Sequence, residues 1–163
     1  MYLTLVIGST GQGKTTFVKK TIGDKPCYIF DVNNEYEFSE DIEDEQARDT
    51  ELDMKKFIQT CSNDIYNRVV VVEDATGYMK GNLGADIIKM VQRKRHTNNN
   101  YIFLFHSVAA VPRQIYDFAN YIVLLRTADL EAEVKKKCPK VLPSFISLKR
   151  SSVKYDKRII KLI

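Results

Sequence analysis

The most constraining feature of the sequence is the octapeptide GSTGQGKT, which begins at residue 8. The apolar run of residues 2–7 precedes it, and residues 14–22 can form a helix after it. A strand, a glycine-rich loop and a helix in this order are the context that a G-x-x-x-x-G-K-[ST] phosphate-binding loop (P-loop) requires. The glycines let backbone N–H groups point at phosphate oxygens, and the helix presents its positive end to the same anion. The motif therefore predicts a nucleoside triphosphate site; a glycine-rich turn without a ligand is the alternative.

We assign nine consecutive residues of this segment to the nucleotide. They are Gly8, Ser9, Thr10, Gly11, Gln12, Gly13, Lys14, Thr15 and Thr16. The amine of Lys14 is expected to reach the outer phosphates, and the hydroxyl of Thr15 is expected to bind Mg²⁺. ATP and Mg²⁺ are therefore the predicted ligands. Because the loop contacts phosphates and no base-specific motif is present, the sequence predicts no base preference.

Length and composition indicate one globular domain. A chain of 163 residues buries roughly 70% of its unfolded surface, and 44% hydrophobic with 28% charged residues is an ordinary balance. No apolar stretch reaches the length of a membrane span, and the first residues lack the basic n-region of a signal peptide. The widely spaced Cys27, Cys61 and Cys138 have no metal-ligand spacing. We therefore expect a cytoplasmic protein with reduced thiols.

Apolar runs alternate with helical or polar stretches along the chain, which predicts a parallel sheet covered on both faces. Expected strands are residues 2–7, 27–32, 68–74, 101–106 and 121–126, and expected helices are residues 14–22, 53–61, 83–97 and 112–118. The third and fourth of these strands are continuously apolar, as central strands are. The predicted fold class is therefore α/β: a P-loop NTPase with three layers (α/β/α) around a mainly parallel sheet.

The C-terminal segment has a different pattern. After an expected helix at residues 128–137, two prolines precede two short alternating runs, at residues 144–149 and 153–162. We predict a short basic hairpin at the sheet edge. Residues 1–130 would then form the ATPase core, and residues 131–163 a basic helix and hairpin packed on it. A solvated edge in which lysines block aggregation is the alternative.

Charge is unevenly distributed along the chain. Residues 35–53 hold ten acids and one base, whereas residues 135–163 hold ten bases and one acid. Three interpretations stay open: two solvated faces, two subunit surfaces that meet head to tail, or a basic face that follows nucleic acid.

Four valines at positions 69–72 lead directly into Glu73 and Asp74. A buried strand that ends in carboxylates is the second half of a phosphoryl-transfer site. By position, Glu73 would bind Mg²⁺ together with Thr15, and Asp74 would activate the attacking water. The usual order in such ATPases is Asp and then Glu, so the shorter side chain stands here in the second place, which would affect the hydrolysis rate rather than nucleotide binding. A solvated strand end is the alternative.

With Thr10 in its third position, GSTGQGKT is similar to the G-x-T-G-x-G-K-T loop of the FtsK–HerA superfamily of pumping ATPases. Residues 27–36, CYIFDVNNEY, resemble that family's second strand, followed by an Asp and then a Glu-Tyr pair. The stretch from Tyr101 to Asp129 resembles its fourth strand, a short helix and a last strand that ends in Arg. The resemblance covers about residues 2–130. It implies one strand between the P-loop strand and the acid strand (the additional-strand type), a ring of about five or six subunits, and double-stranded DNA as the partner.

The resemblance also implies further site residues. His106 stands where the family carries a polar residue that senses the γ-phosphate, and an imidazole can donate a hydrogen bond to phosphate or water; capping of the following turn is the alternative. Ring motors complete the site with an Arg from the neighbouring subunit. Here we favour Arg93 and Arg113 over Arg95 and Arg126, with merely solvated arginines as the alternative.

Contacts with DNA should be electrostatic and independent of base sequence. Lys89, Arg93 and His96 fall on one face of the expected helix, where they can meet a neighbouring subunit or DNA. Lys80 and the three asparagines at positions 98–100 are candidates for lining a DNA pore, with ordinary connecting loops as the alternative.

Together these features predict an ATP-hydrolysing translocase of double-stranded DNA, a subunit of a viral genome-packaging motor that works with a portal or capsid and has no membrane span. Two rivals stay open. One is a P-loop kinase of nucleotides or small molecules, and the other is a nucleotide-gated assembly protein with little turnover.

Overall fold

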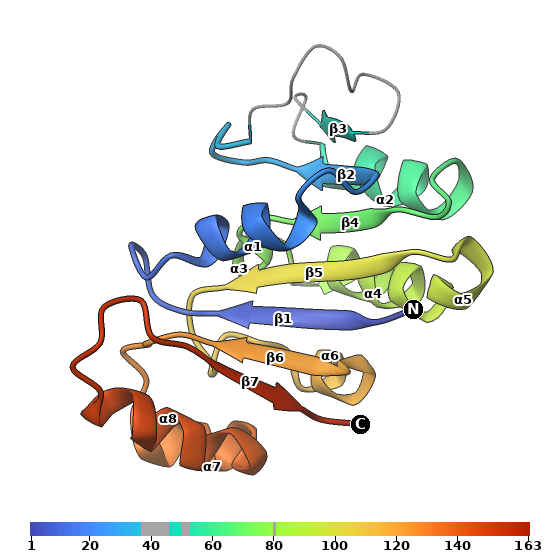
Figure 1. Cartoon of the computed structure of the whole chain (residues 1–163). Helices are drawn as coiled ribbons and strands as arrows, with labels where there is room; N and C mark the ends of the chain where they lie inside the picture. Colours follow the sequence, from blue (N-terminus) through green and yellow to red (C-terminus); the bar gives the residue numbers. More distant parts are fainter. Residues whose placement is uncertain (37–45, 50–52, 80) are drawn as a thin grey trace.

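The computed structural model describes residues 1–36, 46–49, 53–79 and 81–163. Within these residues, seven strands form one sheet in the order β3-β2-β4-β5-β1-β6-β7 (Figure 1). The strands are β1 Leu3–Ile7, β2 Cys27–Phe30, β3 Gln46–Asp49, β4 Val69–Val72, β5 Asn100–Phe105, β6 Tyr121–Leu124 and β7 Arg158–Lys161. Neighbouring strands pair in parallel except β6 and β7, which are antiparallel.

The strand order confirms the additional-strand arrangement. β5 lies between β1, which leads into the P-loop, and β4, which leads into the acids. The continuous apolar sequences of β4 and β5 belong to central strands, as predicted, because each has neighbours on both sides. Parallel strands end at one edge of a sheet, so the segments that follow β1, β4, β5 and β6 meet there.

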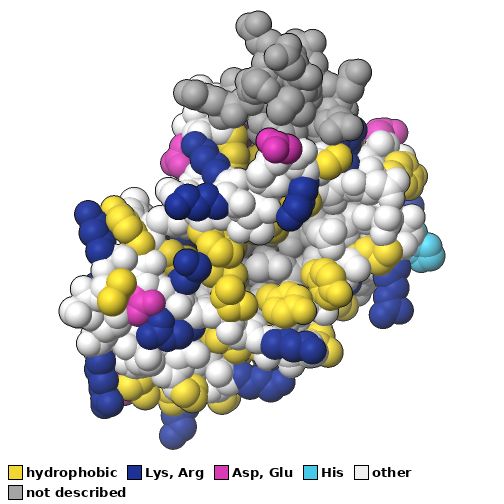
Figure 2. Space-filling model, viewed as in Figure 1, with side chains coloured by type: hydrophobic (Ala, Val, Ile, Leu, Met, Phe, Trp, Pro, Cys, Tyr) yellow, Lys and Arg dark blue, Asp and Glu magenta, His cyan; other side chains and the backbone are white. Residues whose placement is uncertain are grey.

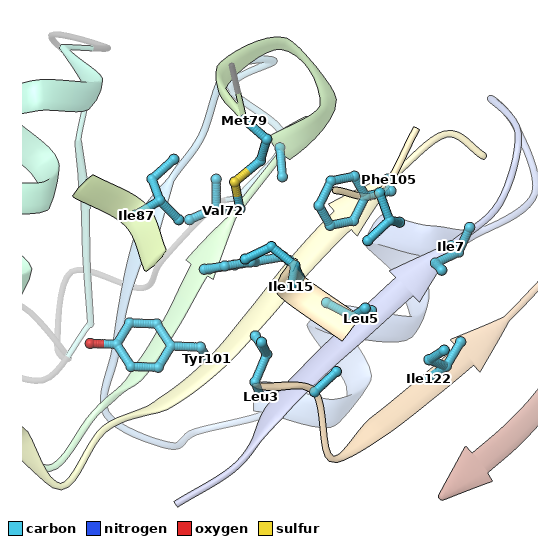
Figure 3. Close-up of a cluster of buried hydrophobic side chains, with 14 of the residues drawn as sticks. Leu3, Leu5, Ile7, Val72, Met79, Ile87, Tyr101, Phe105, Ile115 and Ile122 are labelled. Atoms are coloured by element: carbon cyan, nitrogen blue, oxygen red, sulfur yellow. The ribbon is translucent and has the colours of Figure 1, made fainter. Parts of the chain in front are cut away.

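Helices cover both faces of the sheet and give the three predicted layers (Figure 1). They are α1 Lys14–Ile22, α2 Met54–Asn63, α3 Ala75–Tyr78, α4 Gly81–Gln92, α5 Lys94–Thr97, α6 Arg113–Phe118, α7 Glu131–Lys137, a 3₁₀ turn Pro139–Val141 and α8 Leu142–Arg150. On one face, Val18 and Ile22 of α1 pack with Val6 of β1. On the other face, a larger cluster joins Leu3 and Leu5 of β1 to α2, α4, α6, α7 and α8, and Figure 3 draws part of it.

The predicted C-terminal hairpin is wrong. Residues 144–149 belong to helix α8, and the only strand of this segment, within the described residues, is β7, which pairs with β6. Val141, Phe145 and Leu148 are buried in the main core, and their spacing of four and three residues is that of a helix face. Pro143 stands in the first turn of α8, where a missing N–H group costs nothing.

Three further differences concern short elements. The expected helix at residues 83–97 is divided into α4 and α5. The edge strand β3 was not predicted, because its sequence QARD has no apolar pattern. Asn99 is buried at the amino-terminal edge of the sheet, where its amide donates to the carbonyl of Ile65 and accepts from the N–H group of Arg68. This structural role excludes Asn99 from lining a pore, whereas Asn98 of the same run is exposed.

Two features of the sequence fall mainly on parts of the chain that the structure does not describe. Lys80 lies outside the described residues, as does most of the acidic stretch at residues 35–53. Among the described residues, no helix is long and apolar enough to cross a membrane. Cys27, Cys61 and Cys138 are buried free thiols.

Candidate nucleotide-binding site

The P-loop is fixed between the ends of β5 and β6. The N–H group of Gly8 donates to the carbonyl of Phe105 at 3.0 Å, and that of Ser9 donates to the carbonyl of Arg126 at 2.9 Å. A Cβ atom at Gly8 would lie 2.9 Å from Cβ of Leu125, so only glycine fits in this place. Gly13 has φ +86°, which strains any other residue. The conformation of the loop therefore follows from its glycines.

Behind the P-loop, α1 starts at Lys14 without a side-chain cap. The first N–H groups of a helix have no partner within the helix and attract anions. The residues that carry them, Lys14, Thr15 and Thr16, line a cavity of about 500 Å³ together with Thr10 and parts of the loop. Of the nine residues assigned to the nucleotide, six line this cavity: Thr10, Gly11, Gly13, Lys14, Thr15 and Thr16.

The amine of Lys14 lies folded onto the loop. Its Nζ donates to the carbonyls of Gly8 at 2.7 Å and Ser9 at 3.3 Å, and it is 3.4 Å from Nδ1 of His106. Burial lowers the pKa of Lys14, while the negative charge of Glu73 acts in the opposite direction. A phosphate group in the cavity would offer this amine a charged partner in place of neutral carbonyls, which favours binding.

His106 follows β5 and connects Lys14 with Asp74. Its Nε2 atom is 3.0 Å from Oδ1 of Asp74. Because the Lys14 ammonium can only donate, Nδ1 of His106 must accept, and the proton of a neutral imidazole then resides on Nε2. His106 therefore donates to the Asp74 carboxylate. Asp74 itself has φ 45° and ψ 47°, an uncommon left-handed conformation for a non-glycine residue.

Glu73 is held differently from its neighbour Asp74. Its side chain is 3% exposed and accepts a hydrogen bond of 2.7 Å from the hydroxyl of Tyr36. Burial raises the pKa of Glu73, while hydrogen bonds from Tyr36 and Thr15 act in the opposite direction. Asp31 in turn accepts from the N–H groups of Glu35 at 2.9 Å and Tyr36 at 3.1 Å. The turn after β2 is thus ordered so that Tyr36 reaches Glu73.

The donors beside Glu73 suit Mg²⁺. The Thr15 hydroxyl and the Glu73 carboxylate are oxygen ligands close enough to interact, and magnesium sites of this kind take one or two carboxylates, with phosphates and water as the other ligands. Within the described part of the chain, no group of three or more His, Cys, Asp or Glu side chains could hold a metal ion. A magnesium ion here would therefore depend on the phosphates of the substrate.

Glu73 gives a prediction about stability. Since its pKa is raised in the folded chain, its ionisation destabilises the fold as the pH rises from the ordinary Glu range through the raised value. Glu73→Gln keeps an acceptor for Tyr36 and removes the buried charge. Without nucleotide, this substitution is expected to raise the melting temperature at pH 7–8, by about 2–4 °C for each kcal/mol gained in the free energy of unfolding. The gain in melting temperature should shrink as the pH falls toward 4.

The matched control is Glu131→Gln, because Glu131 is exposed and its only ion pair among the described residues, with Lys149, spans 3.8 Å. Exposed pairs contribute about 0–1 kcal/mol. Thermal melts of both variants across this pH range decide the matter. A melting temperature of Glu73→Gln below that of the parent chain at pH 7–8 would mean that the charge strengthens the Tyr36 bond more than burial weakens it.

The predicted trans-acting arginines do not enter the cavity of their own chain. Arg93 is exposed at the junction of α4 and α5, at the end of the sheet opposite the P-loop. Arg113 is exposed at the start of α6, and the last residue of that helix, Phe118, accepts a hydrogen bond from Lys94 of α5. α6 therefore runs toward the amino-terminal edge. The guanidinium of Arg126 donates to the carbonyls of Ser151 and Val153, so this residue anchors the C-terminal segment.

Sequence reasoning missed several residues of the cavity, two of which come from the C-terminal segment. Tyr155 and Lys157, in the segment before β7, line it beside the P-loop. The ring of Tyr155 lies 3.4 Å from where a Cβ atom of Gly13 would be. Local sequence contains no signal for this contact, because the two residues are far apart in the chain and meet only through the placement of β7 next to β6.

Comparison with known proteins places the fold. A P-loop after β1, carboxylates after β4 and a polar residue after the intervening β5 define an additional-strand P-loop NTPase. The genome packaging NTPase B204 from Sulfolobus turreted icosahedral virus 2, in complex with AMP, has a TM-score of 0.76 at 15% identity, over 99% of this chain and 92% of that one. The DNA-packaging ATPase B204 from Sulfolobus turreted icosahedral virus has a TM-score of 0.73 at 14% identity, over 99% and 98%.

A third similar structure holds ATPases 2 and 3 of EssC from Geobacillus thermodenitrificans, with a TM-score of 0.59 at 13% identity over 98% of this chain and 37% of that one. These matches confirm the resemblance to FtsK–HerA ATPases at the level of the fold. No protein-family model matches the sequence, and no curated protein matches it.

Proposed function

We propose that this chain is an ATP-hydrolysing translocase of double-stranded DNA and a subunit of a viral genome-packaging motor. The observation that carries the proposal is the grouping of the P-loop, Glu73, Asp74 and His106 around one cavity. Such a grouping can hold a triphosphate and a water at its far end. The likeness in fold to a viral DNA-packaging ATPase over nearly the whole of both chains supports DNA as the partner.

The proposed binding mode follows from the contacts already described. N–H groups of the P-loop and of the first turn of α1 hold the β- and γ-phosphates, and Lys14 exchanges its contacts with loop carbonyls for contacts with phosphate. Thr15 and Glu73, together with the phosphates, would hold Mg²⁺, which would supply positive charge to offset the charge that develops during transfer. Burial lowers the pKa of Lys14, and the negative charges of Glu73 and Asp74 act in the opposite direction.

The proposed reaction is an attack of water on the γ-phosphorus. As the new oxygen–phosphorus bond forms, the bond from the γ-phosphorus to the bridging oxygen of ADP breaks, and Asp74 accepts the proton of the water. His106 holds Asp74 through its Nε2–H group, 3.0 Å from Oδ1, and is close enough to the cavity to donate to the γ-phosphate instead. In this role His106 links the presence of the γ-phosphate to the position of the general base.

A basic groove on the other side of the molecule suits the DNA backbone. A cavity of about 560 Å³ between α2 and α4 is lined by Lys55, Lys89, Arg93 and His96, with Asp86 as its acid. The groove lies on the face turned away in Figure 2, which shows a histidine beside basic side chains at the end of the molecule where Figure 1 draws α5. Phosphate contacts from such residues are independent of base sequence and depend strongly on salt. We assign Arg93 to this groove.

This assignment predicts a change in salt dependence. Lys55→Ala and Arg93→Ala are each expected to reduce the slope of log K against log salt for double-stranded DNA by about 1, with equal effects on different DNA sequences. Lys25→Ala, an exposed lysine after α1 that does not line the groove, is the matched control and should leave the slope unchanged. Binding isotherms recorded at several salt concentrations give the slope for each protein. Equal slopes for all four proteins would remove the groove from the DNA-binding surface.

The test of the proposed function is steady-state ATP hydrolysis with and without double-stranded DNA at low salt. DNA should stimulate turnover, and Lys14→Ala should abolish both ATP binding and hydrolysis, since it removes the cation that contacts the outer phosphates. Turnover that ignores DNA but rises with a small acceptor would favour a kinase. Tight ATP binding with no turnover under any condition would favour a nucleotide-gated assembly protein.

A further inference from the structure

The C-terminal segment forms one wall of the nucleotide cavity, although it belongs to no P-loop motif. Tyr155 is 52% exposed, and its ring lies against Gly13. Its backbone has φ 59°, which is unfavourable for a residue with a Cβ atom. An exposed aromatic ring in a strained conformation needs a cause in the surrounding structure.

Hydrogen bonds around Tyr155 hold it in this place. On one side, the guanidinium of Arg126 donates to the carbonyls of Ser151 and Val153. On the other side, the carboxylate of Asp156 accepts from the Ser151 hydroxyl at 2.6 Å and from Arg158 at 2.6 Å. These contacts lower the pKa of Asp156 to about 2. The ring is thus presented to the cavity by a pre-ordered segment.

The order of the strands decides which part of a nucleotide meets Tyr155. The acids and His106 follow β4 and β5, on one side of β1, whereas Tyr155 precedes β7, on the other side of β1. The γ-phosphate must lie beside the acids. A nucleotide laid along the P-loop therefore directs its nucleoside toward β6 and β7, where Phe17, Leu125, Tyr155 and Lys157 line the cavity.

We propose that the ring of Tyr155 is the stacking platform for the base of the bound nucleotide, an inference that rests on the proposed nucleotide-binding function. Stacking on an aromatic ring does not depend on which base is present. The four side chains on this side include no carboxylate or carboxamide to read a base edge. The site therefore binds ATP and GTP with similar affinity, and Tyr155 sets the affinity for the nucleoside as opposed to the phosphates.

The experiment compares ATP, GTP and inorganic tripolyphosphate by calorimetry, without DNA. Tyr155→Ala is expected to weaken binding of ATP and GTP by about 5- to 100-fold and to leave tripolyphosphate binding unchanged. Tyr155→Phe, which keeps the ring, should bind all three as the parent chain does. Equal ATP affinity in the alanine variant would overturn the proposal. Tighter ATP binding there would overturn it as well, because the ring would then obstruct the site.

A second variant gives an optical measurement in a folded chain. The sequence has no tryptophan, so Tyr155→Trp places a single indole at the platform. Its fluorescence should change with ATP and GTP and stay constant with tripolyphosphate; the opposite pattern would contradict stacking. These results separate the two proposals. A chain that binds ATP through Tyr155 without DNA stimulation contradicts only the motor, whereas DNA-stimulated turnover with no contribution from Tyr155 contradicts only the platform.

Discussion

Replacing Asp74 by asparagine is expected to lower kcat by about 10²–10⁴-fold, the contribution of a general base, while ATP still binds. The asparagine carbonyl can still accept the hydrogen bond of 3.0 Å from Nε2 of His106, so the geometry of the site is kept. What is lost is the ability to take a proton from water. Single-turnover hydrolysis together with ATP titration separates the two effects.

The matched control for this substitution is Asp117→Asn. Asp117 is an exposed carboxylate of α6 that does not line the nucleotide cavity, and the same change there should leave kcat and the ATP affinity unaltered. Unchanged turnover in Asp74→Asn would remove the general base from this position. Glu73 is buried and hydrogen-bonded to Tyr36, so it could not readily replace Asp74 as the base. Hydrolysis would then have to proceed without a general base from the protein.

The second large effect is expected for Arg113. With Arg93 assigned to the DNA groove, Arg113 is the candidate that reaches the site of a neighbouring subunit. Arg113→Ala should lower turnover by about 10³–10⁵-fold, the range measured for such arginines, with little change in ATP affinity, since the guanidinium acts mainly on the transition state. The measurement is DNA-stimulated turnover at saturating ATP.

Mixing the Arg113→Ala and Asp74→Asn proteins shows whether Arg113 acts on the site of a neighbouring subunit or on the site of its own chain. Arg113→Ala chains keep Asp74, and Asp74→Asn chains keep Arg113. In the proposed ring, an equal mixture would therefore have both groups intact at roughly one interface in four. Activity should reappear when the two inactive proteins are combined. A mixture as inactive as its components would contradict the assignment. Arg95→Ala, which removes another exposed arginine near α4, is the control and should remain active.

Much of the fold could be predicted because its determinants are local. The P-loop carries its own backbone conformation in its glycines, and buried parallel strands require continuous apolar runs such as the valines of β4. Two errors have different causes, one local and one tertiary. The strand assigned to residues 144–149 neglected the helical spacing of Phe145 and Leu148, and β3 has only four residues, without an apolar pattern. Tertiary pairing with β2, not its own sequence, forms this edge strand.

The candidate site could be predicted only where motif position implies geometry. Glu73 and Asp74 were assigned from their place at a strand end, and the structure brings both beside the P-loop. The bond from Tyr36 to Glu73 and the approach of Tyr155 to Gly13 depend on the meeting of distant segments. Such contacts are set by strand order, and no spacing in the sequence encodes them.

Arg126 makes two separate sets of hydrogen bonds, one through its backbone and one through its side chain. Its carbonyl accepts the N–H group of Ser9, and its guanidinium holds the carbonyls of Ser151 and Val153. Both of these bonds are donated by one nitrogen of the guanidinium, Nη2. Among relatives of this chain, the arginine at position 126 should therefore co-vary with the length and sequence of residues 151–158, and be indifferent to changes in the acids after β4. Loss of residues 151–158 would remove the reason for an arginine at this position, whereas the backbone carbonyl that holds Ser9 would remain with any side chain.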